Sequence, residues 1–235
     1  MGGLSIPPLT KGVKAIGIAT LALSVITMFD AAAPVLHAVV FRPAALLRTP
    51  WSPLTYTLVD PEPQSILFSL LGLWLLGSAM EQRWGTRRFV IFYFLSGALA
   101  ALATFVVSRF APAVASYPYF GNSAALAAMA AAFSIQFADS IIFLIIIPVP
   151  GKWLLPISAA MTGLFMIKSW PPYLPQLFGL GAGVLLSGGV SPGHFWLRAR
   201  VWWIDRRLRR SKLRIVRGAG PDDKPGARGS DKYLH

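Results

Sequence analysis

The chain has 235 residues, of which 55% are hydrophobic and only 13% are charged. A soluble globular domain usually carries about 25% charged residues, so the composition excludes an ordinary soluble protein. Because the chain has no cysteine, disulfides, thiolate nucleophiles and cysteine-based zinc sites are excluded as well. Residues 194–235 hold 12 of the 22 Lys and Arg residues. The sequence therefore predicts a nearly charge-free membrane domain, 1–193, followed by a basic tail, 194–235, that is partly amphipathic and then disordered.

Six apolar stretches approach the roughly 20 residues that a helix needs to cross a bilayer. In chain order they are 13–29, 65–80, 89–107, 123–137, 153–167 and 174–186. Several are short, which predicts that some helix ends are buried in protein or line a cavity. The first stretch follows Lys11 and Lys14 and precedes three alanines, so a cleaved signal peptide is the alternative to a retained first helix.

The segment 30–64 lies between the first two stretches and is rich in proline, which excludes a long regular helix. It also carries aromatic and aliphatic side chains. We expect it to lie in the membrane interface, with Trp51 and Tyr56 at headgroup depth.

The distribution of basic residues predicts the orientation. With both termini cytoplasmic, the inner segments hold 18 Lys and Arg residues and the outer segments hold 4. This asymmetry favours cytoplasmic termini, and we expect a bacterial inner membrane. The basic tail is expected to contact anionic lipid. A nucleic-acid partner is not expected, because no aromatic-interleaved basic groove is present.

Two stretches carry residues that suggest a site. Ser123 begins the alanine-rich fourth stretch, whose small side chains predict a helix at the bundle centre. The plain interpretation of this serine is an N-cap. In the sixth stretch, Gly179 and Gly183 have the spacing of close helix packing. Gln176 is a polar residue in an apolar stretch, where such residues are costly and often functional.

The order of these features resembles the rhomboid intramembrane serine protease superfamily. Five segments carry the resemblance: 50–56, 81–89, 121–124, 147–153 and 176–183. The first is similar to the family's loop tryptophan motif, with Trp51. The second is the most specific match and resembles the turn between the second and third helices, which gives Arg83, Gly85 and Arg87 a structural role. The resemblance implies an all-α membrane protein with a six-transmembrane-helix rhomboid-like bundle.

The resemblance also implies a serine–histidine dyad, from which this sequence departs. Ser123, in Gly121-Asn122-Ser123, matches the nucleophile, but Gln176 occupies the expected histidine position. An amide cannot accept a proton near neutral pH, so the general base is missing. Family residues that bind the oxyanion, the final glycine of the serine motif and a loop arginine are also replaced, by Ser65, Ser69, Ala124 and Ser52.

No other residue supplies the base in an obvious way. His37 lies in the first loop, His194 lies beyond the sixth stretch, and His235 is the last residue. Lys168 is predicted on the outer side, where a serine–lysine pair is the remaining option. The sequence thus predicts a pseudoprotease that binds membrane-protein clients or transmembrane helices without cleaving them. The alternatives are an active intramembrane serine endopeptidase with a non-standard base and a membrane scaffold or transporter. No metal or cofactor is expected.

Overall fold

The computed structural model describes residues 8–29, 33–144 and 147–187. The predicted basic tail, 194–235, lies outside these residues, as does the predicted domain boundary at 193. For residues 141–144 and 147–148 only the backbone is described.

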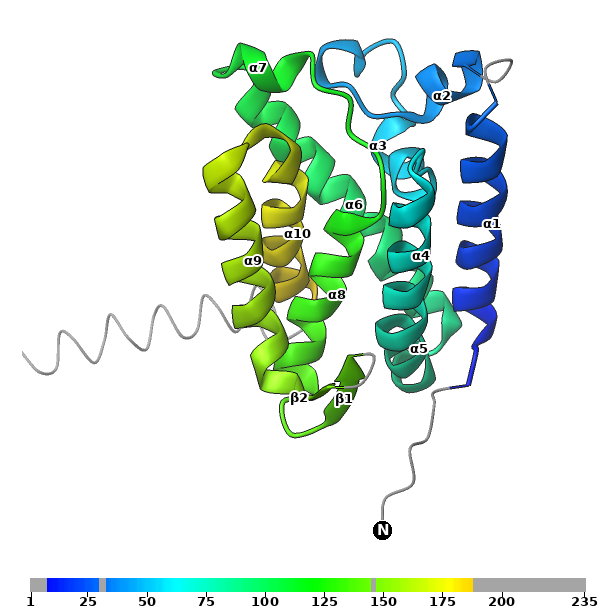
Figure 1. Ribbon diagram of the computed structural model, residues 1–235, viewed down its shortest axis with the longest axis vertical. Helices are drawn as coiled ribbons and strands as arrows, with labels where there is room; N and C mark the ends of the chain where they lie inside the picture. The colour runs from blue at the N-terminus through cyan, green and yellow to red at the C-terminus, as the bar shows by residue number, and fades with distance from the viewer. Residues whose placement is uncertain (1–7, 30–32, 145–146, 188–235) are drawn as a thin grey trace, which may run out of the picture. The chain divides into compact units, whose positions relative to one another are not determined.

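The described chain is built mainly of helices (Figure 1). The helices are α1 (Lys11–Thr27), α2 (Ala33–Val39), α3 (Ser52–Thr55), α4 (Pro63–Gly72), α5 (Ser78–Trp84), α6 (Thr86–Ser108), α7 (Pro112–Ala115), α8 (Ser123–Gln136), α9 (Leu154–Lys168) and α10 (Leu174–Leu186). A π-helical segment, Leu73–Gly77, joins α4 to α5. Short 3-10 turns occur at Pro43–Ala45, Tyr56–Leu58, Gly151–Trp153 and Pro171–Tyr173. All six predicted apolar stretches fall on helices, while the number of membrane spans stays a prediction.

Two helical segments are long and apolar enough to cross a bilayer. They are Pro63–Trp84, which has 22 residues, and Thr86–Ser108, which has 23 residues. At a rise of about 1.5 Å per residue, each matches a hydrocarbon core about 30 Å thick. Large apolar side chains also face outward on several other helices, including Ile18 on α1 and Leu164 on α9. An outward apolar surface of this kind is typical of helices that contact lipid.

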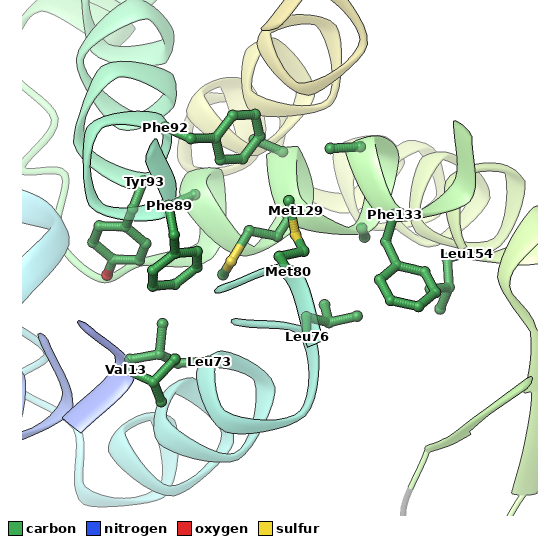
Figure 2. Packing of buried hydrophobic residues seen from close by; sticks show 14 of the residues in the cluster. Val13, Leu73, Leu76, Met80, Phe89, Phe92, Tyr93, Met129, Phe133 and Leu154 are labelled. Atoms are coloured by element: carbon green, nitrogen blue, oxygen red, sulfur yellow. The ribbon is translucent and has the colours of Figure 1, made fainter. Parts of the chain in front are cut away.

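The core lies where α1, α6, α8 and the segment 73–80 converge (Figure 2). Val13, Leu73, Met80, Phe89 and Met129 pack together there and are almost completely buried. Most of α8 is buried, including the alanines that follow its first residue. This agrees with the prediction that the alanine-rich helix lies at the bundle centre, because small side chains let neighbouring helices approach closely.

The segment between α1 and α4 contains only short helices and turns, as its prolines predict. Trp51 is half exposed, and its indole N–H donates to the Ala38 carbonyl at 2.9 Å. Tyr56 differs, because it is fully buried and its hydroxyl donates to the Gly97 carbonyl in α6 at 2.9 Å. Tyr56 therefore fixes the loop to the protein core, whereas Trp51 keeps the exposure expected of an interfacial side chain.

A two-stranded antiparallel hairpin adds to the helical architecture. Its strands are β1 (Ile141–Leu144) and β2 (Ile147–Pro150), with Ile141 paired to Pro150. The hairpin connects α8 to the turn that precedes α9. The sequence predicted helices alone, so the hairpin is a departure from that prediction.

Candidate functional site

The contact between α8 and α10 sets the position of the candidate site (Figure 1). A Cβ atom added at Gly179 would lie 2.2 Å from the Ala124 carbonyl oxygen, and one added at Gly183 would lie 2.2 Å from that of Ala128. Both glycines therefore touch the backbone of α8 directly. Because both contacts advance by four residues, the two helices run parallel. This register places the start of α10, with Gln176, at the same end of the pair as Ser123.

A cavity of about 240 Å³ lies between the start of α8, the start of α4 and the loop before α4. Its lining is Asp60, Ser65, Phe68, Ser69, Phe120, Gly121, Asn122, Ser123 and Leu126. Ser123 is the first residue of α8 and is exposed, so its hydroxyl is accessible from the cavity. Five of the six predicted pseudo-active-site residues thus line this one cavity, and Gln176 is the exception.

Gly121 and Asn122 shape the approach to Ser123. Gly121 has a φ of +85°, a conformation that L residues with a side chain rarely adopt. Its N–H donates to the Val59 carbonyl at 2.7 Å and ties the segment to the loop before α4. Asn122 is 1% exposed, and its side-chain amide donates to the Ser69 carbonyl at 3.4 Å. The Asn122 side-chain oxygen has no hydrogen-bond partner among the described residues.

Asp60 is the residue that the sequence analysis missed. It is 4% exposed and lines the cavity, and its Oδ2 accepts a hydrogen bond from the Ser69 hydroxyl at 3.1 Å. Its backbone N–H donates to the Ser24 hydroxyl at 2.9 Å. Burial raises the pKa of the Asp60 carboxyl above its ordinary value, and the hydrogen bond from Ser69 acts against that rise. The signal in the sequence was an acidic pair, Asp60 and Glu62, within an otherwise apolar and proline-rich segment.

Gln176 is half-buried on α10 and does not line the cavity. Within the part of the chain that the structure describes, its amide makes no hydrogen bond to Ser123. Ser65 and Ser69, both on α4, line the cavity. The Ser65 side chain is half-buried and that of Ser69 is buried. The structure thus brings together Ser65, Ser69 and Ser123 and leaves Gln176 on the neighbouring helix.

The segment 81–89 has a structural role that centres on Glu81. The Glu81 carboxylate accepts hydrogen bonds from the backbone N–H groups of Gly12 at 2.7 Å and Val13 at 2.9 Å. It also accepts from the hydroxyls of Thr10 and Thr86, the latter at 2.6 Å. One carboxylate therefore caps the N-terminus of α1 and also binds the first residue of α6 through the Thr86 hydroxyl.

The three motif residues singled out from the sequence have smaller roles. The Arg83 guanidinium lies 4.6 Å from the centre of the Phe137 ring, a cation–π contact between α5 and the end of α8. Gly85 separates α5 from α6 and has a φ of +80°. Arg87 is exposed in the first turn of α6. Of these three residues, Gly85 is the one whose backbone conformation favours glycine over residues with a side chain.

The chemistry available to the cavity is that of hydroxyls, one amide and one carboxylate. Among the described residues, no cluster of His, Cys, Asp and Glu has the composition of a metal site. Asp60 is the one titratable side chain in the lining. The architecture is that of a helical protein with a serine presented at the start of a central, small-residue helix.

The Rhomboid domain family model matches residues 47–192. The chain therefore belongs to the rhomboid family, whose members are integral membrane proteins. It is also similar to "Rhomboid protease GluP" of Bacillus subtilis (strain 168), with 34% identity over 76 residues. The aligned segment is 32% of this chain and 15% of that protein.

Proposed function

We propose that this chain is a rhomboid pseudoprotease, which binds transmembrane helices of membrane-protein clients at its cavity and does not cleave them. One observation carries the proposal. The cavity beside Ser123 contains a buried carboxylate, Asp60, while the α10 position expected to hold the base is an amide, Gln176.

The missing base limits the nucleophile. A serine hydroxyl needs a neighbouring group to take its proton before it attacks a peptide carbonyl. The Gln176 amide has no proton-accepting nitrogen at neutral pH. No described residue, Gln176 included, forms a hydrogen bond with the Ser123 hydroxyl. Attack by Ser123 would therefore start from an unactivated hydroxyl.

The lining also disfavours the charge that peptide hydrolysis generates. The tetrahedral intermediate carries an oxyanion, which a protease stabilises with hydrogen-bond donors. Losing one such donor typically costs about 10² to 10³ in rate. Here the Ser69 hydroxyl already donates to Asp60 and the Asn122 amide already donates to a carbonyl. An ionised Asp60 in the same cavity would repel a developing negative charge.

Asp60 also supports the second candidate, an intramembrane serine endopeptidase with a non-standard base. A buried carboxylate whose pKa is raised is a better proton acceptor than an exposed one. In this candidate, Asp60 takes the Ser123 proton. Against it, the Asp60 Oδ2 is engaged by Ser69 and not by Ser123.

A covalent probe separates the two candidates. The purified full chain in detergent is treated with a fluorophosphonate at several pH values, alongside Ser123→Ala, Asp60→Asn and an active rhomboid protease. The pseudoprotease proposal predicts no labelling that depends on Ser123 at any pH. Labelling that requires both Ser123 and Asp60 would establish the second candidate instead.

Client binding is tested by photo-crosslinking from the cavity rim. Phe68 lines the cavity and is 59% exposed, so Phe68→benzoylphenylalanine presents the photoprobe at its opening. Leu102 on α6 is 45% exposed and does not line the cavity, which makes Leu102→benzoylphenylalanine the matched control. In proteoliposomes with a single-span reporter helix, the proposal predicts crosslinking from position 68 well above that from position 102. Equal yields would contradict binding at the cavity.

A further inference from the structure

The cavity lining contains two buried hydrogen-bond acceptors that have no partner among the described residues. The Ser69 hydroxyl and the Asn122 amide are donors, and both are engaged within the site, with the Asp60 Oδ2 and the Ser69 carbonyl respectively. The second Asp60 oxygen, Oδ1, and the Asn122 side-chain oxygen have no hydrogen-bond partner among the described residues. Asp60 is 4% exposed and Asn122 is 1% exposed. Two deeply buried acceptors in one lining are thus without donors.

Among the residues that the structure describes, no cation acts on the Asp60 carboxyl. Burial is the largest influence on the pKa of the Asp60 carboxyl and raises it. The neighbouring groups that also act on this carboxyl are the hydroxyls of Ser69 and Ser65 and the backbone and charge of Glu62. None of these is a cation, and the Glu62 charge raises the pKa further. A buried carboxylate without a compensating positive charge is unfavourable in its ionised form, so an incoming cation would gain electrostatic stabilisation there.

We propose that this cavity binds a cationic side chain, the ammonium of Lys or the guanidinium of Arg, projecting from a client's transmembrane helix. The unpartnered oxygens of Asp60 and Asn122 accept its hydrogen bonds. This inference rests on the proposed client binding and specifies which helices are recognised. A cationic residue within an apolar span is costly in lipid and seeks a polar or anionic partner. The cavity supplies that partner next to the outward-facing apolar surface of α4.

The dimensions of the cavity agree with this ligand. A volume of about 240 Å³ suits one long side chain and not a whole helix. Phe68 and Leu126 provide apolar contacts for the methylene groups, while Asp60 and Asn122 provide the polar end. A ligand that combines an aliphatic stem with a terminal donor matches this arrangement.

The test compares reporter helices that differ at one position. Three single-span helices carry Lys, Met or Glu at the same site in the outer half of the span. Each is reconstituted in proteoliposomes with the full chain bearing Phe68→benzoylphenylalanine, with or without Asp60→Asn. The matched control is Glu62→Gln, because Glu62 is a neighbouring carboxylate that is exposed and does not line the cavity.

The Lys helix is expected to crosslink about tenfold more than the Met helix, in keeping with hydrogen bonds to a charged group, and the Glu helix least. Asp60→Asn is expected to reduce the Lys yield to the Met yield measured with the same variant, and thermal unfolding in detergent checks separately that the variant is folded. Glu62→Gln is expected to keep the preference. Equal yields for Lys and Met helices, or a Lys preference that survives Asp60→Asn, would overturn this inference alone. Absence of crosslinking by every helix would overturn the proposed client binding and the inference with it.

Discussion

Two regions meet at the start of α8: its contact surface with α10 and the cavity beside Ser123. They differ in how much room they leave for an added side chain. At the contact surface, Gly179 and Gly183 touch the α8 backbone, so there is no room for a Cβ atom. The cavity, by contrast, is an open volume of about 240 Å³ lined by polar side chains that include Asp60, Ser69 and Asn122. The packing of α10 on α8 therefore depends on the absence of side chains at two positions, whereas the cavity has room for substitutions that change its chemistry.

The largest expected effect concerns the contact surface. Gly179→Ala and Gly183→Ala should each lower the free energy of unfolding by about 3 kcal/mol, because the new Cβ meets backbone atoms that cannot rotate away. Gly181→Ala on the same helix is the matched control, since nothing lies within 4 Å of its added Cβ. It should be neutral or slightly stabilising. Thermal unfolding in detergent measures all three, and similar melting temperatures would break the comparison.

The next effect concerns Glu81, which holds the N-termini of α1 and α6 together. Glu81→Gln replaces an acceptor by a donor opposite the Gly12 and Val13 N–H groups, so a loss of about 2 kcal/mol is expected. Glu62→Gln, at an exposed carboxylate, should have little effect. Unfolding measurements on both variants test this. A Glu81→Gln protein as stable as the wild type would show that the cap contributes nothing.

A smaller effect is expected at Gly85. Its φ of +80° and ψ of 156° are unfavourable for any residue with a Cβ atom, although nothing lies within 4 Å of the added atom. Gly85→Ala should therefore cost about 1.5 kcal/mol through backbone strain alone. Gly163→Ala, which is equally unobstructed but helical, is the control. If both variants unfold at the same temperature, backbone strain at position 85 does not lower the stability of the protein.

The smallest effect is a change in pH dependence at the cavity. Burial raises the pKa of Asp60 above its ordinary value of 3.8, so the folded protein holds this proton more tightly than the unfolded chain. The stabilisation from the neutral carboxyl is complete below the ordinary value and is lost as pH rises through the raised pKa. Asp60→Asn should therefore flatten the decline of melting temperature with pH in that window. Parallel curves for the wild type and the variant would contradict a buried, titrating Asp60.

The sequence predicted much of the contact surface and only part of the cavity. The spacing of Gly179 and Gly183 is a local pattern, and it correctly indicated close packing. Ser65, Ser69 and Ser123 were found through the resemblance to a known family. Asp60 was missed because its partners are defined by the fold.

The same limit applies to Glu81 and Tyr56. The Glu81 hydrogen bonds reach Gly12 and Val13, which lie 69 and 68 residues earlier in the chain. The Tyr56 hydroxyl finds its acceptor, the Gly97 carbonyl, 41 residues later. No local sequence pattern identifies partners so far apart in the chain. A polar side chain in an apolar segment therefore indicates that a hydrogen bond is formed, but does not identify the partner.

Cleavage of a transmembrane reporter by the purified chain is the most direct test of the proposed loss of catalysis. The full chain and Ser123→Ala are reconstituted in proteoliposomes with a single-span substrate, and products are resolved by mass spectrometry. The account predicts an intact reporter with both proteins, while an active rhomboid in parallel vesicles cuts it. A new peptide terminus that appears with the wild type and disappears with Ser123→Ala would contradict the account.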